Sequence, residues 1–442
     1  MRFSAWSFLV GGILWLNSLQ AFAQPDTASS ATWNFAVSGD SRNCGDVVMP
    51  SIAADAQRNQ AAFYLHLGDL RAIYKVDEDL QHSPEWRGQT LPLDRYQKIA
   101  WDDFVQSQLA PFGNMPVYVG IGNHETIAPM SRAGFVAAFA DWLNAPVLRQ
   151  QRLADDPKDY RVRPYYHWIQ GGVDFIYLDN ASRDQFDAGQ INWIEGVLKR
   201  AAENPQVRSL VVGMHAALPY SLSAGHSMNE SEEGIQGGGR VYLDLLNFRE
   251  KTGKRVYVLA SHSHFYMTDI YNTAYWRAHG GVLPGWIIGT GGAVRYALPE
   301  DALRAEGRLP AAKGNAPSNH APGGKAIQDP AHTSEAANQD TQSAQDAPPT
   351  QEALQKTYGY LLATVHPDGA IDFRFHEFQR SDVPDAVVQR YTSELVDFCF
   401  NENTDFPKPK RRPESANALS PSSKPGETPE AKGRESKAGT PK

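Results

Sequence analysis

The chain has 442 residues, of which 41% are hydrophobic and 21% are charged, and its formal net charge is −8 at pH 7. This length is enough for one large domain or two modest domains. Residues 407–442 carry nine Lys/Arg against four Glu, so the rest of the chain is more acidic than the total charge suggests. An acidic body has no basic face for nucleic acid, and we expect no nucleic-acid binding.

The first residues have the pattern of a secretory signal peptide. Arg2 precedes an apolar run over residues 8–16, and Ala21-Phe22-Ala23 supplies the small-x-small pattern at which signal peptidase cleaves. The run is too short to cross a bilayer comfortably. We therefore expect cleavage after Ala23, removal of residues 1–23, and a secreted or periplasmic protein without membrane insertion afterwards. An uncleaved membrane anchor is the alternative.

Short apolar segments alternate with helix-length segments along the chain. The expected strands are rich in β-branched or aromatic residues and end in polar or glycine-containing turns. They cover residues 33–38, 62–67, 117–121, 174–178, 210–214 and 256–260. Periodicity predicts helices over 93–109 and 190–202. This alternation predicts an α/β layered domain with largely buried sheets. Residues 358–365 and 371–378 are expected to form an antiparallel hairpin.

Two segments have compositions that do not support folding. Residues 304–352 are rich in Ala, Pro, Gly, Gln, Asp and Ser and contain almost no large apolar side chain, so burial cannot offset the entropy of ordering. The tail over 404–442 repeats this composition with more Lys and Pro. We expect 304–352 to be a disordered insertion and 404–442 a disordered tail, which leaves a domain made of 30–303 and 353–403.

Two cysteines, Cys44 and Cys399, stand at opposite ends of this domain. In an oxidising compartment they form one disulfide or remain two separate buried thiols.

Polar side chains stand where five of the six predicted strands end. In chain order they are Asp40, Asp69, Asn123 with His124, His215, and His262 with His264. Ligands bind at the carboxyl ends of strands in open α/β sheets, so we expect these side chains at one end of a sheet. Carboxylate, imidazole and amide oxygen without thiolate suit Mn, Fe or Zn. Two such ions can clamp a phosphate and activate a water, so this set of ligands suits phosphoester hydrolysis.

The ordered motifs Gly-Asp, Gly-Asp, Gly-Asn-His-Glu, His and (Gly/Ser)-His-x-His resemble those of the calcineurin-like metallophosphoesterase superfamily, which includes the purple acid phosphatases. The resemblance extends over about residues 40–264 and implies a four-layer α/β/β/α sandwich. It also implies two divalent or trivalent metal ions. Asp40 and His264 would bind the first ion and Asp69 would bridge both.

The same resemblance assigns the remaining roles. Asn123, His215 and His262 would bind the second ion. His124 would sit over the phosphate as general acid, with metal-bound hydroxide as the nucleophile.

The first motif departs from the usual pattern, because Arg42 stands where most members of the superfamily have a histidine ligand. Purple acid phosphatases use a tyrosine at the position of Ala72. Water, Asn43 or Tyr74 could complete the first metal site, or that site is weak or empty. The planar guanidinium of Arg42 suits a phosphate oxygen, so we expect a catalytic role for it; pairing with a neighbouring carboxylate is the alternative.

Residues 216–240 follow His215 directly and contain a glycine-rich stretch, which predicts a long loop that covers the site as a substrate lid. Two roles remain open for His226 and Arg240 on this segment: a contact with substrate, or a position on a surface loop without a role in the site. The other histidines, including His66 and His167, are interpreted as core or surface residues.

Two functions follow from these observations. The first is hydrolysis of small phosphorylated substrates, with monoester or diester preference open. The alternative is a non-catalytic metal-binding or phosphate-binding protein on the same fold, degenerate at the first metal site because of Arg42.

Overall fold

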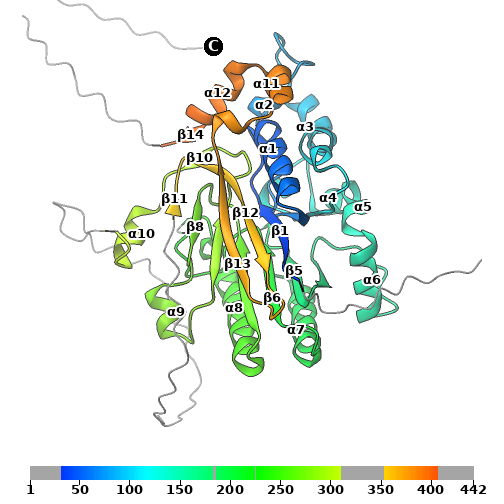
Figure 1. Cartoon of the computed structure of the whole chain (residues 1–442), viewed down its shortest axis with the longest axis vertical. Coiled ribbons are helices and arrows are strands. Elements are labelled where there is room, and N and C mark those ends of the chain that lie inside the picture. The colour runs from blue at the N-terminus through cyan, green and yellow to red at the C-terminus, as the bar shows by residue number, and fades with distance from the viewer. Residues whose placement is uncertain (1–30, 183–185, 224, 310–352, 407–442) are drawn as a thin grey trace, which may run out of the picture. The chain divides into compact units, whose positions relative to one another are not determined.

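The computed structural model describes residues 31–182, 186–223, 225–309 and 353–406 (Figure 1). Within these residues the strands form a five-stranded sheet, a seven-stranded sheet and a two-stranded pair. The five-stranded sheet has the order β13 (Ile371–Phe378), β12 (Tyr358–Val365), β1 (Trp33–Ser38), β2 (Ala61–His66), β3 (Val117–Val119). The seven-stranded sheet has the order β11 (Ala353–Leu354), β8 (Tyr266–Thr268), β9 (Gly285–Ile288), β7 (Arg255–Ala260), β6 (Ser209–Met214), β5 (Val173–Leu178), β4 (Tyr166–Gln170). The pair joins β10 (Arg295–Tyr296) to β14 (Thr404–Asp405).

The two large sheets pack face to face through aromatic side chains. Phe35 of β1 stacks on Phe63 of β2 with ring centroids 5.3 Å apart, and Phe175 of β5 meets Phe63 edge-on at 5.1 Å. Trp168 of β4 is fully buried in the same cluster. Such aromatic pairs bury large apolar areas, so this layer forms the core between the sheets.

Helices cover the outer face of each sheet. Helix α1 (Gly45–Arg58) packs Ile52 against Tyr64 of the five-stranded sheet. Helices α7 (Ala188–Glu203) and α8 (Glu232–Thr252) cover the seven-stranded sheet, with Ile194 and Leu245 in one cluster with Val212. The arrangement is helix, sheet, sheet, helix, so the predicted four-layer α/β/β/α sandwich is confirmed.

The strands and helices follow the sequence pattern closely. The predicted hairpin is present as β12 and β13, which pair antiparallel from Tyr358↔Phe378 to Val365↔Ile371. The helix expected over 93–109 is α3 (Leu93–Asp103) continued by a π-helical segment (Phe104–Leu109). The other helices are α2 (Glu78–Gln81), α4 (Arg132–Ala138), α5 (Ala140–Leu143), α6 (Pro146–Asp155), α9 (Ala274–Ala278), α10 (Glu300–Ala305), α11 (Asp385–Tyr391) and α12 (Ser393–Asn401).

The segment 216–240 is not a loop throughout, which corrects the prediction for its second half. Helix α8 begins at Glu232, with the Ser231 side chain accepting a hydrogen bond from the Gly234 N–H at its start. The glycines inside the helix permit close packing: a Cβ added at Gly238 would lie 2.6 Å from Cδ of Pro219. Packing therefore accounts for Gly238, whereas a Cβ at Gly239 would meet no atom within 4 Å.

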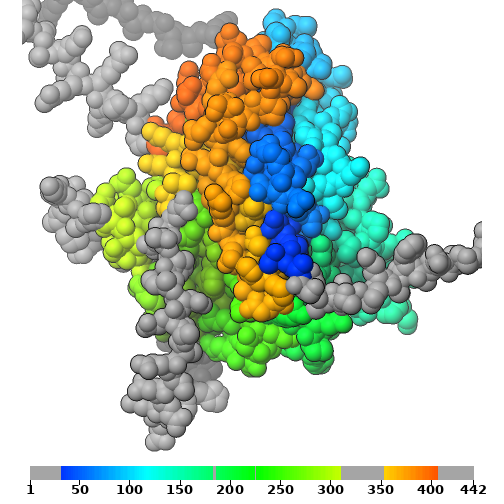
Figure 2. Space-filling view, in the orientation of Figure 1, coloured from blue at the N-terminus to red at the C-terminus, as the bar shows by residue number. Residues whose placement is uncertain are grey.

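The C-terminal segment of the described chain packs against its N-terminal segment (Figure 2). Helix α12 and the start of α1 share a buried cluster that includes Val47 and Val396. Cys44 and Cys399 form a disulfide within it, which settles the alternative left open above.

The predicted signal peptide 1–23 lies outside the described residues, as do most of the predicted insertion and tail. Thr404 and Asp405 pair with β10, so the folded part extends slightly past residue 403. Over the described ranges, no helix combines the length and apolar character needed to cross a membrane.

Candidate metal centre

The structure brings all six predicted ligands together, but from two sheets and not from one. Asp40, Asp69 and Asn123 follow β1, β2 and β3 of the five-stranded sheet, whereas the histidines follow β6 and β7 of the seven-stranded sheet. The expectation of a single sheet edge is therefore corrected. The carboxyl ends of parallel strands from both sheets converge across the interface between them.

Four of these residues surround one point: Asp69, Asn123, His215 and His262. We call them the His215 group. Nε2 of His215 lies 3.0 Å from Oδ1 of Asn123 and 3.0 Å from Nδ1 of His262. It also lies 3.3 Å from Oδ1 of Asp69. Ligand atoms of Asp69, His215 and His262 are all within 4.8 Å of one another, as is required to share one ion.

A second set, which we call the Asp40 group, consists of Asp40, Asp69 and His264. Nε2 of His264 is 3.2 Å from Oδ1 of Asp40, and ligand atoms of all three residues lie within 4.8 Å of one another. Asp69 belongs to both groups. Its carboxylate is thus the one side chain placed to serve both positions.

The hydrogen bonding around these residues fits metal ligation. Nδ1 of His215 donates to the Leu67 carbonyl at 3.0 Å, and Nδ1 of His264 donates to the Val294 carbonyl at 2.6 Å. Each bond leaves Nε2 free to face the centre, as outer hydrogen bonds do for metal-bound histidines. Within the described chain, Oδ1 of Asp40 and Oδ2 of Asp69 are buried and accept no well-formed hydrogen bond, although His264 lies 3.2 Å from the first and Arg42 3.5 Å from the second. Buried oxygens of this kind are costly unless a cation satisfies them.

The electrostatics keep both carboxylates ionised. Burial alone would raise the pKa of Asp40, but His264 and His215 bring it below its usual value. The pKa of Asp69 is likewise well below its usual range, because His124 and His215 outweigh its burial. Ionised carboxylates are the form that binds metal.

Three of the six residues have a left-handed backbone. The φ angles are 58° at Asp40, 59° at Asp69 and 65° at His262. Residues with a Cβ rarely adopt this conformation, and when they do it is often at functional sites. The turn is tight: a Cβ added at Gly122 would lie 2.3 Å from Oδ1 of Asp69. The strand-end glycine therefore makes room for the shared carboxylate.

Arg42 reaches into the Asp40 group. Its Nη2 lies 2.9 Å from Nε2 of His264, and its Nε lies 3.5 Å from Oδ2 of Asp69. The residue is buried, with 5% of its surface exposed. The guanidinium thus contacts two ligand atoms of this group directly.

His124 lies beside Asp69. Its backbone N–H donates to Oδ1 of Asp69 at 3.0 Å, and its Nδ1 donates to the Ala72 carbonyl at 2.6 Å. Nε2 is left 3.6 Å from Oδ2 of Asp69, on the side of the centre. The half-exposed ring of Tyr74 packs on the imidazole with centroids 5.4 Å apart.

Glu125 organises this region, a role that the sequence reading did not assign. Its buried carboxylate accepts backbone N–H groups from Asp69, Leu70 and Gly122 at 2.7–3.0 Å. Burial and the neighbouring Asp69 raise its pKa to about 8. The available signal was its position, since an acid three residues after a strand-end glycine commonly caps a turn.

Of the two residues named on the 216–240 segment, only His226 reaches the centre. Its ring lies 5.2 Å from that of His262, and it stacks on Tyr296, which in turn stacks on His264 at 4.0 Å. Arg240 instead pairs with Glu195 on α7 at the surface. Of the two alternatives left open for Arg240, its position agrees with the surface one, although on a helix and not on a loop.

Of the two side chains suggested to complete the first site, Asn43 is engaged by another residue, whereas Tyr74 lies beside His124 at the edge of the centre. Nδ2 of Asn43 donates to Glu78, and Tyr74 has 53% of its surface exposed. His66 is buried and bonded to Ser41, as expected for a structural histidine.

A scan of the chain against protein-family profiles finds no match, and a search among curated proteins finds none either. Among solved structures, the chain is similar to PhoD with a TM-score of 0.46 and 15% identity, over 78% of this chain and 66% of that one. It is also similar to a protein described as a proposed 5'-nucleotidase of Staphylococcus aureus, solved with alpha-ketoglutarate. The TM-score there is 0.40 and the identity 11%, over 83% of this chain and 59% of that one. The chain thus spans less than two thirds of each. Neither likeness is strong enough to assign an activity.

Proposed function

We propose that this protein hydrolyses esters of phosphate on small substrates with the help of bound metal ions. The observation that carries the proposal is the position of Asp69, whose carboxylate belongs to both the His215 group and the Asp40 group. The ordered motifs that resemble the metallophosphoesterase superfamily support the same function. The donor set of carboxylate, imidazole and amide suits Mn, Fe or Zn.

When bound, two such ions clamp a phosphate and lower the pKa of a water molecule so that it can attack phosphorus. The chain's own residues bind and orient the substrate. Arg42 presents a planar cation for a phosphate oxygen. Since Nδ1 of His124 is held by the Ala72 carbonyl, its Nε2 is the atom that can hold a proton for the leaving-group oxygen.

The test compares the wild-type protein with Asp69→Ala and His124→Ala, on an aryl phosphate and on a bis-aryl phosphate. We expect turnover to be abolished or nearly so in both variants, with a loss of metal content in Asp69→Ala only. His279→Ala is the matched control, because His279 is exposed. Full activity of purified Asp69→Ala or His124→Ala would refute the proposal. The ratio of rates on the two substrates reports the monoester or diester preference.

A second function is favoured by the contacts of Arg42 with His264 and Asp69. If the guanidinium permanently occupies the Asp40 group, the protein is a non-catalytic metal-binding or phosphate-binding protein with one ion in the His215 group. Metal analysis combined with the same substrates separates the two. Turnover that rises as added metal fills a second, weaker site supports the hydrolase, whereas one equivalent without turnover even at saturating metal supports the binding protein.

We also propose that the protein is exported to a secreted or periplasmic location. The Cys44–Cys399 disulfide supports this, since disulfides persist mainly in oxidising compartments. Cell fractionation checks it, and a protein retained in the cytoplasm at full length would contradict it.

A further inference from the structure

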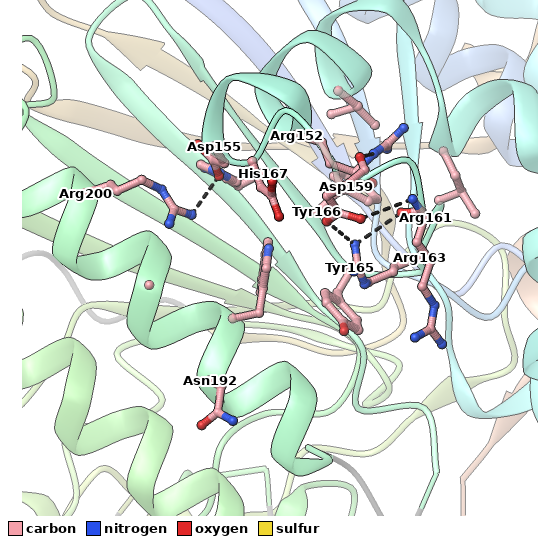
Figure 3. Close-up of a pocket in the computed structure, with 15 residues that line it drawn as sticks. Arg152, Asp155, Asp159, Arg161, Arg163, Tyr165, Tyr166, His167, Asn192 and Arg200 are labelled. Atoms are coloured by element: carbon pink, nitrogen blue, oxygen red, sulfur yellow. Dashed lines mark hydrogen bonds and ion pairs between the residues drawn. The ribbon is translucent and has the colours of Figure 1, made fainter.

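A cavity of about 200 Å³ lies on the seven-stranded sheet, between α6, the edge strand β4 and α7. None of the metal-centre residues lines it. Figure 3 shows Arg200 and Asn192 projecting from α7 on one side, with Asp159, Arg161 and Tyr165 opposite. The lining residues are Leu143, Leu148, Arg152, Asp155, Asp156, Asp159, Arg161, Arg163, Tyr165, Tyr166, His167, Asn192, Trp193, Gly196 and Arg200.

The cations at this cavity outnumber the acids that face them. Four arginines line it against three aspartates. Arg200 pairs with Asp155 at 2.7 Å, and Arg163 pairs with Asp159 at 2.6 Å. The side chain of Arg161 has no hydrogen-bond or ion-pair partner within the described ranges. One guanidinium at the cavity is therefore available to a ligand.

The base of the cavity holds a further positive charge. Nε2 and Nδ1 of His167 donate to Asp155 and Asp174 at 2.6 and 2.8 Å. Burial alone would lower the pKa of His167, but the two carboxylates raise it to about 9. His167 and Arg200 together balance the charges of Asp155 and Asp174, so this cluster offers little repulsion to an incoming anion.

Arg152 shows that positive charge is crowded here. Its pKa is lowered by burial, and the neighbouring Arg163 and Arg149 lower it further, against the opposing effect of Asp159. An anion placed among these side chains would relieve that repulsion.

One wall of the cavity is aromatic. The rings of Tyr165 and Trp193 lie 5.0 Å apart at 55° to each other, and both residues are only partly buried. The guanidinium of Arg163 lies over the Tyr165 ring, 5.9 Å from its centroid. A planar ring packed on this wall would place a substituent near the arginines.

We propose that this cavity binds a small organic anion built on a single planar ring. The ring packs against Trp193 and Tyr165, and the anionic group meets Arg161 and Arg163. The volume of about 200 Å³ is below the roughly 300–1,000 Å³ of pockets that bury drug-sized ligands, so the ligand is a one-ring compound. Charge-assisted hydrogen bonds from Arg161 give the anion its affinity, and the aromatic wall selects for the ring.

Titration calorimetry with three probes tests separately whether the cavity recognises the anionic group and whether it recognises the planar ring. Phenylphosphonate carries the ring and the anion and is not hydrolysed, inorganic phosphate carries the anion alone, and phenol carries the ring alone. We expect phenylphosphonate to bind at least tenfold more tightly than either of the others. Equal affinity for phosphate and phenylphosphonate would overturn the proposal, as would the absence of phenylphosphonate binding.

Variants locate the binding. Arg161→Gln, at an exposed residue, is expected to weaken phenylphosphonate binding about tenfold or more through the loss of a charged hydrogen bond. Trp193→Leu, checked for folding by circular dichroism, is expected to weaken it as well. Arg149→Gln is the matched control, because Arg149 is an exposed arginine on α6 that does not line the cavity, and less than a twofold effect is expected.

Repeating the titration with Asp69→Ala tests whether the measured phenylphosphonate binding takes place at the metal centre. We expect Asp69→Ala to retain the binding event that Arg161→Gln weakens, whether or not the metal centre of the wild-type protein binds a second molecule of phenylphosphonate. Binding that is lost in Asp69→Ala but unchanged in Arg161→Gln would place the ligand at the metal centre and refute the proposal. The outcome of these titrations therefore does not depend on whether the protein hydrolyses phosphate esters.

Discussion

Replacing Arg42 by glutamine measures how strongly its guanidinium opposes a metal ion in the Asp40 group. The guanidinium lies 2.9 Å from Nε2 of His264 and 3.5 Å from Oδ2 of Asp69. A metal bonded to the same nitrogen at about 2.1 Å would stand at most about 5 Å from the guanidinium atom in contact with it. A doubly charged ion and the arginine would thus be close neighbours of like charge.

The size of this repulsion follows from Coulomb's law. At about 5 Å, a charge of +2 and a charge of +1 repel by about 7 kcal/mol with an effective dielectric constant of 20, and by about 2 kcal/mol in bulk water. Even the smaller value lowers metal affinity about 20-fold. We therefore expect the wild-type protein to bind one ion tightly in the His215 group and a second ion far more weakly.

Manganese titration with metal analysis is the assay. In Arg42→Gln we expect the weak site to gain at least about 20-fold in affinity, so that the purified protein approaches two equivalents, while the tight site changes little. Arg240→Gln makes the same substitution at an arginine that pairs with Glu195 at the surface, and it should leave both affinities unchanged. Two equally tight sites in the wild-type protein, unchanged in Arg42→Gln, would refute the reasoning.

Three further predictions concern stability. Reducing the Cys44–Cys399 disulfide, which closes a separation of 355 residues, should lower the free energy of unfolding by about 6 kcal/mol in the loop-entropy account. Urea unfolding with and without reductant checks this, and reductant should not affect the double serine variant. Because the pKa of His167 is raised to about 9, its stabilisation is complete below about pH 6.5 and is lost as pH rises through 9. His167→Gln should flatten this part of the stability–pH curve, and an unchanged curve would contradict the assignment. Glu125→Ala leaves three buried N–H groups unpaired and should lower the free energy of unfolding by about 3 kcal/mol or more. Glu125→Gln keeps one acceptor oxygen, so unfolding measurements should show a smaller loss of stability in this variant.

The strands and their ends could be predicted because burial and turn chemistry are local signals. Strand β1 (Trp33–Ser38) was expected with the bounds it has, and Asp40 follows it by two residues. The ligand order was visible for the same reason, since the ligands stand close after strand ends; all but His215 are next to a glycine or serine, and His215 directly follows β6. That the ligands come from two sheets was not visible, because sheet membership depends on long-range pairing such as β1 with β12, more than 300 residues apart.

Other features required the three-dimensional structure. The glycines at 237–239 favoured a loop, yet α8 runs through them, and Gly238 packs against Pro219. Arg240 was expected on that loop, either at the substrate or at the surface, and is instead on an exposed helix face. Tyr296 carries no motif, and only the fold stacks it on His264. Such contacts depend on packing between distant segments, which residue pattern does not encode.

The left-handed backbone at Asp40, Asp69 and His262 has a consequence for engineering this chain. Glycine adopts that conformation freely, whereas residues with a Cβ do so at a cost on the order of 1 kcal/mol. A screen that rewards only resistance to heat would therefore favour glycine at all three positions, and every such gain would delete a ligand. Thermostable variants of this protein should hold these three positions constant and be sought among the outer helices, where improved folding and an intact centre do not conflict.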